Sequence, residues 1–375
     1  MKILMVITEG DLGGAQRHVL DISRELSKRG HELLIAIGGD FTELSDAAAS
    51  SILPIETVRL QNVGREIKPA KDLRGLLEIY KLIRTWKPDI VHCHSSKVGV
   101  LASIAGRVAG AKVVYTAHGF VFCEELPIVT RLVYLLAEKI STLFRHKVIA
   151  VSQSDADAAR KNFIVSSKKL TIIPNGLDLS IEDRLLDVKS AREMISVWAG
   201  ADVSDAKIVL SIANFYPAKN LSLLVQSFES VLARIPEARL VLVGDGKERH
   251  ACERLVEQNP KLHEKVFFTG KRADAFQVLR GADVVALSST KEGMPYVVLE
   301  AKFAGTPVVA TRVGGIPEMG EGSDLKLVVP HSPEMLSEAL VQMLRTEKQA
   351  RGHLPWQFTL TGMVDAIEAV YHEIV

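Results

Sequence analysis

The sequence predicts an α/β protein with two domains, each built around a parallel β-sheet. Short aliphatic runs alternate with segments of helical periodicity, and helices are the usual connections between parallel strands. The alternation pauses once, from the turn cluster Pro174–Asp178 to about Asp205. The 375 residues, 47% of them hydrophobic, are too many for one small core. These observations favour two successive series of βαβ units.

The first series starts with an apolar run at Ile3–Thr8, which predicts the first strand. A helix is expected at Ala15–Arg29, because its aliphatic residues recur at helical spacing and form one apolar face. Further β-branched and aliphatic runs predict strands at Glu32–Ile37, Asp89–Cys93, Lys112–Thr116, Lys147–Val151 and Leu170–Ile173.

The second series begins with a strand at Lys207–Ala213, and an amphipathic helix is expected at the end, Phe358–Ile374. We therefore divide the chain into residues 1–175, 176–357 and 358–375. The other strands of this series are predicted at Arg239–Gly244, Val266–Phe268, Asp283–Leu287, Pro307–Thr311 and Leu325–Val329.

Composition narrows the class of protein. The net charge of +1 gives no overall field that would attract nucleic acid, so we expect no such partner. The three cysteines are scattered, which indicates a reducing compartment without disulfides. We find no signal peptide and no apolar run of the ~18 residues that cross a bilayer. We expect a cytoplasmic protein, either fully soluble or peripheral to the cytoplasmic face of the membrane.

The segment predicted as a helix at Val129–Arg145 bears on that choice. It mixes aliphatic residues with cationic ones, among them Arg131 and Lys139. Such a helix either docks on an anionic membrane or packs into the core, and both alternatives stay open.

The segment from Glu292 to Glu300 is the most informative in the chain. It places two carboxylates across the start of a predicted helix, with Gly293 and Pro295 breaking the backbone before it. A helix N-terminus offers unpaired N–H groups and about half a positive charge, which suit an anion. Carboxylates about 12 Å apart along a helix fit a ligand with a central diphosphate and flanking hydroxyl groups. The alternative is a solvated Glu292 and a Glu300 that complements the helix dipole.

This segment resembles the E-x7-E motif of retaining glycosyltransferases with the GT-B architecture, family 4 in particular. The likeness extends to Gly314–Glu318 and covers nearly the whole chain. It implies two Rossmann-like domains that face a cleft. Residues 1–175 would then bind the acceptor, residues 176–357 would bind the nucleotide sugar, and helix 358–375 would return to the N-terminal domain.

The resemblance also implies roles for individual residues. Glu292 would hold hydroxyl groups of the transferred sugar, Lys219 would neutralise the leaving diphosphate, and His118 would orient the sugar. We name these three as catalytic. Glu300 would bind the ribose, and the other donor-binding residues implied are Gly13, Gly14, Asn214, Gly270, Lys271, Arg272, Gly293, Met294, Pro295, Tyr296 and Val297.

The first turn, Glu9–Gln16, carries the paired glycines Gly13 and Gly14. Paired glycines let the backbone approach a ligand closely, although a plain tight turn is the alternative. The turn does not match G-x-G-x-x-G, which disfavours a nicotinamide enzyme. The resemblance places this backbone near the donor diphosphate and the acceptor.

Asn214 departs from the family pattern. Family 4 usually has a Gly-Arg pair here and a lysine five residues after the arginine; Lys219 matches the lysine, but Asn214 replaces the arginine. Asparagine donates only neutral hydrogen bonds, whereas arginine binds phosphate bidentately. Either Lys271, Arg272 or Arg17 compensates, or donor binding or turnover is weak.

Two short patterns resemble metal sites, and we interpret neither as one. His92 and His94 share a face of one strand, but no third ligand lies nearby in the sequence. Asp155 and Asp157 are expected early in a helix, where side chains two residues apart diverge. We therefore predict no metal and no cofactor.

The residues after the third strand of the first series are expected on the acceptor side, namely His94, Ser95 and Lys97. This stretch, together with Tyr115–Phe120, resembles bacterial enzymes that build exopolysaccharide, capsule or O-antigen units.

The expected activity is transfer of a hexosyl or N-acetylhexosaminyl residue with retention of the anomeric configuration. The donor is a nucleotide-diphosphate sugar, with UDP as the expected nucleotide. The acceptor is a glycan, such as one linked to polyprenyl diphosphate, in cell-surface polysaccharide synthesis. A UDP-sugar epimerase of the same fold and a catalytically silent nucleotide-sugar-binding subunit stay open as alternatives.

Overall fold

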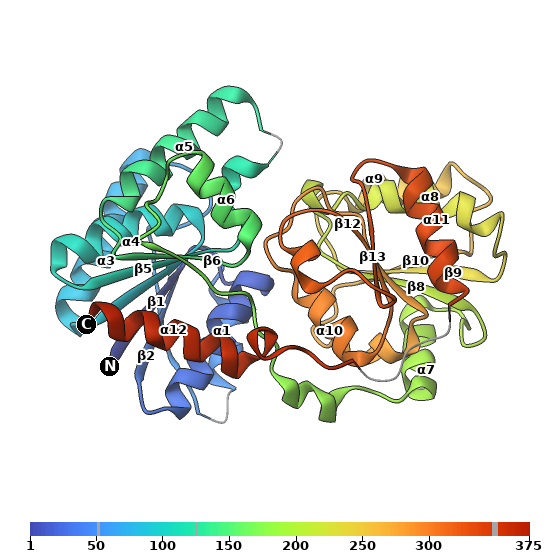
Figure 1. Cartoon of the computed structure of the whole chain (residues 1–375), viewed down its shortest axis with the longest axis horizontal. Helices are drawn as coiled ribbons and strands as arrows, with labels where there is room; N and C mark the ends of the chain where they lie inside the picture. The colour runs from blue at the N-terminus through green and yellow to red at the C-terminus, as the bar shows by residue number, and fades with distance from the viewer. Residues whose placement is uncertain (51–52, 125, 347–351) are drawn as a thin grey trace. The chain divides into compact units, whose positions relative to one another are not determined.

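The computed structural model describes residues 1–50, 53–124, 126–346 and 352–375. The chain forms two compact units (Figure 1). Unit 1 comprises Met1–Asp178 and Trp356–Val375, and unit 2 comprises Leu179–Pro355. These bounds lie within three residues of the predicted ones, 175/176 and 357/358. The last segment of the chain therefore folds with its beginning.

Unit 1 contains a seven-stranded parallel sheet in the order β3-β2-β1-β4-β5-β6-β7. Each predicted strand of the first series is present, with its ends shifted by one residue at most. The strands are β1 (Lys2–Ile7), β2 (Glu32–Ile37), β3 (Glu56–Arg59), β4 (Ile90–His94), β5 (Lys112–Ala117), β6 (Lys147–Ala150) and β7 (Leu170–Ile172).

Strand β3 is the one that the sequence analysis missed. It is four residues long, only partly buried, and pairs with β2 at the edge of the sheet. An edge strand can face water, so it lacks the aliphatic run that reveals a central parallel strand.

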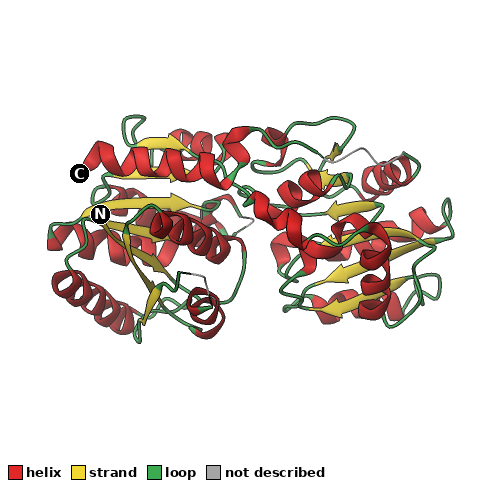
Figure 2. Cartoon of the chain, turned by 90° about the horizontal axis from the view of Figure 1, so that it is seen from below, coloured by secondary structure: helices red, strands yellow, loops and turns green. Residues whose placement is uncertain are grey.

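Helices cover both faces of this sheet (Figure 2). One apolar core lies under α3, α4, α5 and α6, and a second lies under α1, α2 and α12. Strands buried on both faces read as continuous aliphatic runs, which is why the pattern predicted them. The helices are α1 (Gly14–Lys28), α2 (Thr42–Ala49), α3 (Pro69–Trp86), α4 (Ser96–Ala109), α5 (Ile128–Thr142), α6 (Gln153–Lys161) and α12 (Leu360–Ile374).

The C-terminal helix α12 is part of the second core of unit 1. Its Ile367 and Tyr371 are fully buried, and it packs along α1. Arg29, just after α1, bonds to Asp365 at 2.7 Å and to Glu368 at 2.8 Å. Apolar burial and these ion pairs together hold the last segment of the chain on unit 1.

Unit 2 contains a six-stranded parallel sheet in the order β10-β9-β8-β11-β12-β13. Helices α8, α9 and α11 cover one face, and α7 and α10 lie on the other. The strands are β8 (Lys207–Ile212), β9 (Ala238–Val243), β10 (Val266–Gly270), β11 (Val284–Leu287), β12 (Val308–Thr311) and β13 (Leu325–Val328). The helices are α7 (Val188–Ala199), α8 (Leu221–Leu232), α9 (Arg249–Glu257), α10 (Tyr296–Ala304) and α11 (Pro333–Leu344).

Both sheets reverse their strand order once, in unit 1 between β1 and β4 and in unit 2 between β8 and β11. In open parallel sheets, ligands bind beyond the carboxyl ends of the strands at such a reversal. A ligand site is therefore expected in the loops after these four strands.

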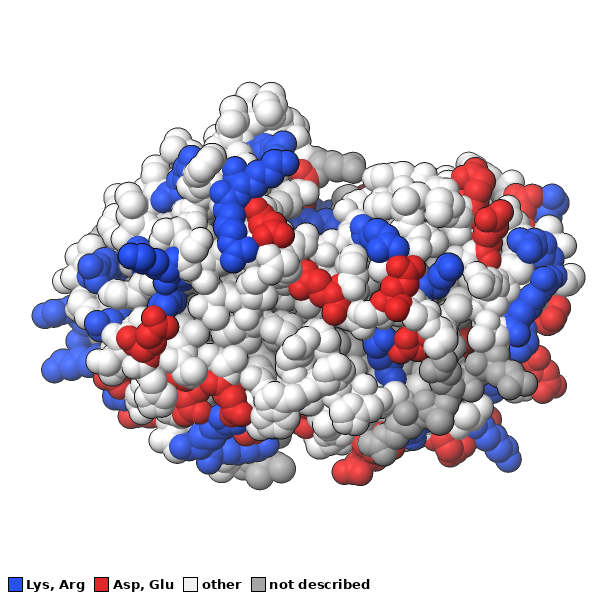
Figure 3. Space-filling view, in the orientation of Figure 1, with Lys and Arg blue, Asp and Glu red and all other residues white. Residues whose placement is uncertain are grey.

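Two surface properties bear on partners. Within the part of the chain that the structure describes, no helix is both long enough and apolar enough to cross a bilayer. Acidic and basic side chains are interspersed over the face seen in Figure 3, in keeping with the net charge of +1.

Candidate functional site

An ion pair joins the loops after β8 and β11 in unit 2. Lys219 Nζ lies 2.6 Å from Glu292 Oε1, and the Ser289 hydroxyl donates to the same oxygen at 2.7 Å. The Glu292 side chain is only 8% exposed, whereas that of Lys219 is 28% exposed. Glu292 is thus held in place rather than solvated, and the ammonium group still reaches solvent.

Backbone contacts fix the loop that carries Glu292. The Ser288 hydroxyl donates to the carbonyl oxygens of Lys219 at 3.0 Å and Asn220 at 2.9 Å. On the other side, the Gly315 N–H donates to the carbonyl of Gly293 at 2.7 Å. The glycine-rich stretch after β12 therefore holds this loop directly after Glu292.

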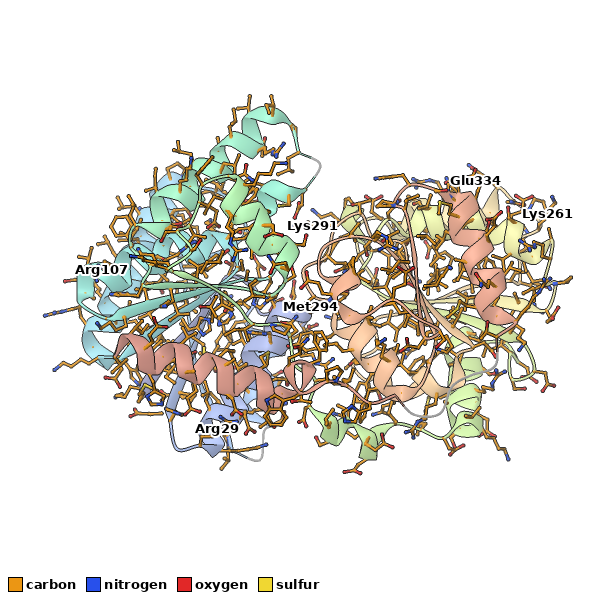
Figure 4. The ribbon with its side chains drawn as sticks, in the orientation of Figure 1. Arg29, Arg107, Lys261, Lys291, Met294 and Glu334 are labelled. Atoms are coloured by element: carbon orange, nitrogen blue, oxygen red, sulfur yellow. The ribbon has the colours of Figure 1, made fainter. Side chains whose placement is uncertain are left out.

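Helix α10 begins directly after this loop. Pro295 is its N-cap, Tyr296 is its first residue, and no acidic residue lies in its first turn. Met294, labelled in Figure 4 in the loop before the helix, is buried, as is Tyr296. Glu300 is buried in the second turn of α10. A residue that only complements the helix dipole would lie in the first turn and face solvent. No acidic side chain in the first turn therefore neutralises the positive end of α10, which directly follows the loop that carries Glu292.

The other predicted donor residues of unit 2 lie around β8 and β10. Asn214 is partly buried after β8, and its carbonyl accepts from the Tyr216 N–H at 2.8 Å. Gly270 ends β10, which β9 and β8 separate from β11. Lys271 and Arg272 are exposed, and the Arg272 guanidinium lies 5.5 Å from the ring centre of Trp198.

Three cations could substitute for an arginine at position 214, namely Arg17, Lys271 and Arg272. Among the residues that the structure describes, neither Lys271 nor Arg272 forms a hydrogen bond with Asn214. Arg17 lies in unit 1 and pairs with Asp21 at 3.4 Å. Arg272 stacks on Trp198, and Lys271 follows the end of β10. Compensation for the missing arginine therefore stays a prediction.

In unit 1, the strand reversal brings the loops after β1 and β4 together. The Thr8 and Ser95 hydroxyls lie 2.7 Å apart, and the Thr8 N–H donates to Ser95 at 3.2 Å. Gly13 is the N-cap of α1 without a side-chain cap, and Gly14 is the first residue of the helix. Lys97 Nζ lies 2.7 Å from a carboxylate oxygen of Asp72, so its charge is compensated within the unit.

Three histidines meet beside this reversal. His18 comes from α1, His94 is the last residue of β4, and His118 directly follows β5. The His94 Nδ1 and His118 Nε2 atoms are 3.2 Å apart, and the His18 and His118 ring centres are 4.6 Å apart. Desolvation lowers the pKa of His18 to about 4 and lowers the pKa of His94 and His118 well below the usual value. The cluster is therefore neutral at neutral pH.

His92 shares a face with His94, as the spacing predicted, and the two ring centres lie 4.2 Å apart. Its partners are the Tyr371 hydroxyl at 2.6 Å and the Thr116 hydroxyl at 2.7 Å. Both ring nitrogens are thus used inside the core, and burial lowers the pKa of His92 well below the usual value.

Sequence reasoning missed three residues around these sites. Ser289 shares Glu292 with Lys219, His18 joins the histidine cluster, and Asn175 Oδ1 lies 3.0 Å from His18 Nδ1. Of these three residues, only His18 could have been predicted from spacing. It lies four residues after Gly14 and hence on the same side of α1. Asp155 and Asp157 both lie in α6 and their side chains diverge: Asp155 is buried near Ser152, whereas Asp157 is exposed and pairs with Arg160.

Two family models match the chain. Residues 12–181 match the model described as Glycosyltransferase Family 4, and residues 206–346 match the model described as Glycosyl transferases group 1. The two matches cover most of unit 1 and most of unit 2. The chain is a family 4 glycosyltransferase. This confirms the resemblance drawn from the sequence and assigns the enzyme to the EC 2.4 class.

Two bacterial relatives are similar to this glycosyltransferase over most of its length. The UDP-Gal:alpha-D-GlcNAc-diphosphoundecaprenol alpha-1,3-galactosyltransferase of Escherichia coli is 28% identical over 321 residues, 83% of this chain and 82% of the relative. The N-acetyl-alpha-D-glucosaminyl L-malate synthase of Bacillus anthracis is 26% identical over 391 residues, 100% of this chain and 98% of the relative.

Solved structures confirm the predicted GT-B fold. Anabaena Alr3699/HepE in complex with UDP-glucose has a TM-score of 0.79 and 21% identity, with full coverage of both chains. A glycosyltransferase from Rickettsia africae ESF-5 has a TM-score of 0.76 and 20% identity, and covers 100% of this chain and 98% of its own. At these identities the likeness shows the fold alone.

Proposed function

We propose that the enzyme transfers a sugar from a UDP-sugar to a lipid-linked glycan acceptor with retention of the anomeric configuration, in the synthesis of a cell-surface polysaccharide. The observation that carries the donor half is the Lys219–Glu292 pair beside the N-terminus of α10, at the reversal between β8 and β11. It supports the proposal because a cation, a helix N-terminus and a carboxylate are the groups that a diphosphate sugar needs. The UDP-glucose bound by Alr3699/HepE and the UDP-Gal named for the E. coli relative support UDP as the nucleotide.

Charge development explains the roles in unit 2. As the bond from the anomeric carbon to the β-phosphate oxygen breaks, negative charge builds on the phosphate and positive character on the sugar. Lys219 and the N–H groups of Tyr296 and Val297 stabilise the phosphate charge, as oriented donors do where charge develops. Glu292 holds sugar hydroxyl groups and Glu300 the ribose. The acceptor oxygen bonds to the anomeric carbon on the face that the phosphate leaves, and its proton passes to the departing phosphate.

The acceptor half rests on unit 1. His118 orients the transferred sugar, and the acceptor approaches the loop with His94, Ser95 and Lys97. Gly13 and Gly14, at the uncapped start of α1, offer backbone N–H groups to the donor diphosphate. The E. coli relative is named for a diphosphoundecaprenol-linked acceptor, which supports a polyprenyl-diphosphate glycan here. The epimerase and silent-subunit alternatives are not favoured, since the relatives and family models are those of transferases.

Helix α5 supports a peripheral contact with the cytoplasmic face of the membrane. Its buried residues are polar, namely Glu138, Ser141 and Thr142. Arg145, just beyond the helix, is 1% exposed and pairs with Glu138 at 2.7 Å. The aliphatic face points to solvent instead, and 46% to 70% of each residue is exposed at Ile128, Val129, Leu132, Val133, Leu136 and Ile140.

This inverted arrangement suits a lipid surface. Burying one such side chain contributes about 1.5–3 kcal/mol, so several outweigh the cost of binding a bilayer surface. Arg131 and Lys139, exposed on the same helix, complement anionic headgroups. We therefore choose membrane docking over core packing, and an anionic bilayer over a second protein.

A donor panel tests the transferase proposal. UDP-, GDP-, ADP- and dTDP-sugars are incubated with polyprenyl-diphosphate glycans, nucleotide release is measured, and the product anomer is read by NMR. We expect release from a UDP-sugar only, with retention. An inverted product contradicts the mechanism, interconversion of the UDP-sugar without acceptor favours the epimerase, and no release from any donor favours the silent subunit.

Vesicle co-sedimentation tests the membrane proposal separately. We expect binding to vesicles that contain phosphatidylglycerol and at least tenfold weaker binding of the Val133→Ser/Leu136→Ser variant. Val197→Ser, at an exposed valine on α7 in unit 2, is the matched control and should bind as the unmodified protein does. Equal binding by all three proteins would show that α5 is not the docking surface.

A further inference from the structure

We propose that His18, His94 and His118 form a binding site for a divalent cation of the zinc class. Each residue offers one ring nitrogen, and the three nitrogens all lie within 4.8 Å of one another. They come from α1, the end of β4 and the loop after β5. Local spacing indicates only the His92–His94 pair, because the fold brings His18 and His118 to His94 from distant parts of the chain.

The spacing fits a site that closes around an ion. Zinc–nitrogen bonds of about 2.0–2.1 Å place the nitrogens of a tetrahedral site roughly 3.4 Å apart. The cluster has to contract by roughly 1.5 Å at its widest. Rotation about the two side-chain torsions of a histidine supplies such a movement, and His118 is only partly buried.

Two further observations point to a ligand. His18 Nδ1 lies 3.0 Å from Asn175 Oδ1; an amide oxygen accepts, so Nδ1 carries the proton and Nε2 is the nitrogen with the lone pair. Metal-binding histidines are commonly oriented by such a bond from their second nitrogen. His94 Nε2 is buried and has no hydrogen-bond partner among the described residues. A bound ion, directly or through a coordinated water, would compensate this buried polar atom.

The donor set selects the type of ion. Three imidazoles without a carboxylate suit borderline metals such as Zn²⁺ or Co²⁺, and disfavour Mg²⁺ and Ca²⁺, which prefer oxygen. Three protein ligands also leave a fourth position for water. An ion on His118 would compete with its contact to the transferred sugar and inhibit the enzyme. That consequence rests on the proposed function, whereas binding of the ion does not.

Metal titration of the chelator-treated full chain tests the site. We expect one Co²⁺ per chain with visible ligand-field bands, and Zn²⁺ displacing it. His18→Gln and His94→Asn should each weaken Zn²⁺ binding at least tenfold. His31→Gln is the control in unit 1, where His31 contacts Glu368 and the chain terminus, and His250→Gln is the exposed control in unit 2. Both controls should bind as the unmodified protein does.

X-ray absorption on the unmodified Zn²⁺ protein covers the case in which a variant fails to fold. About three imidazole nitrogens around zinc would support the site. Fewer than two, or loss of binding in His31→Gln instead of His94→Asn, would overturn it. Transfer assays with added Zn²⁺ are scored apart: binding without inhibition would argue against the role of His118 in transfer and leave the metal site standing.

Discussion

The Tyr371 hydroxyl lies 2.6 Å from Nδ1 of His92, so the C-terminal helix is bonded to the strand that carries His94. Both residues are fully buried, and the Thr116 hydroxyl occupies the other nitrogen of His92. The last turns of the chain thus support the strand end on which the unit 1 site is built.

Tyr371→Phe should lower the stability of unit 1. It removes the hydroxyl and leaves a buried ring nitrogen of His92 without its partner, which costs about 1–3 kcal/mol. Hydrogen exchange of the β4 amides measures the loss. Tyr80→Phe, at a partly buried tyrosine of α3, is the matched control, and an equal loss in both variants would contradict the role of the His92 contact.

Gly314→Ala should impair transfer more than it impairs stability. A Cβ at Gly314 would lie 1.7 Å from the carbonyl oxygen of Glu292, so the loop that carries Glu292 must move. Displacement of a catalytic group by about 1 Å costs up to about a hundredfold in rate. We expect a loss of that order in kcat/KM, measured with the donor identified by the panel.

Gly320→Ala is the control for backbone strain alone. Gly320 has a positive φ of +83°, as Gly314 has one of +53°, but a Cβ at Gly320 would meet no atom within 4 Å. It should lose stability yet keep its transfer rate. If both variants lost activity equally, the contact with Glu292 would not be the cause.

Lys219→Met should lower kcat by about 10²–10³, as loss of a group that stabilises developing charge does. Glu292→Gln should also lower kcat, and full turnover in that variant would refute the assignment. Because the two side chains are 2.6 Å apart, the double variant should lose less than the product of the single losses. Lys261→Met, at an exposed lysine labelled in Figure 4, should leave kcat unchanged.

Unit 1 should lose stability as the pH falls below about 6.5. Burial lowers the folded-state pKa of His18 to about 4, and those of His92, His94 and His118 well below the ordinary value, whereas the unfolded chain titrates near 6.5. The unfolded state therefore binds more protons below that pH, and stability present above it is lost on acidification.

At pH 5.5, with chelator present, each of these histidines should cost up to about 1.4 kcal/mol relative to pH 7.5. Hydrogen exchange of the β4 amides, corrected for the intrinsic effect of pH, measures the loss. His250→Gln should keep the same pH dependence, because that side chain is 84% exposed. Equal stability at the two pH values would refute the burial of neutral histidines.

The residue pattern predicted strands accurately where both faces of the sheet are buried. Strands such as β2 and β8 are aliphatic on both faces, so their bounds could be read to within a residue or so. Strand β3 escaped because an edge strand needs no such run. The same limit applies to α5, because its sequence pattern did not record that Glu138 faces the interior while Leu132 and Leu136 are exposed.

The sequence by itself determined the α/β class, the two units and the Glu292–Glu300 segment, because these depend on residue periodicity and on residues close together in the chain. Only the tertiary structure decided that Lys219 reaches Glu292 and that His18, His94 and His118 meet. Those contacts follow from the order of strands in each sheet. That order is set by the packing of distant segments, and local spacing in the sequence does not encode it.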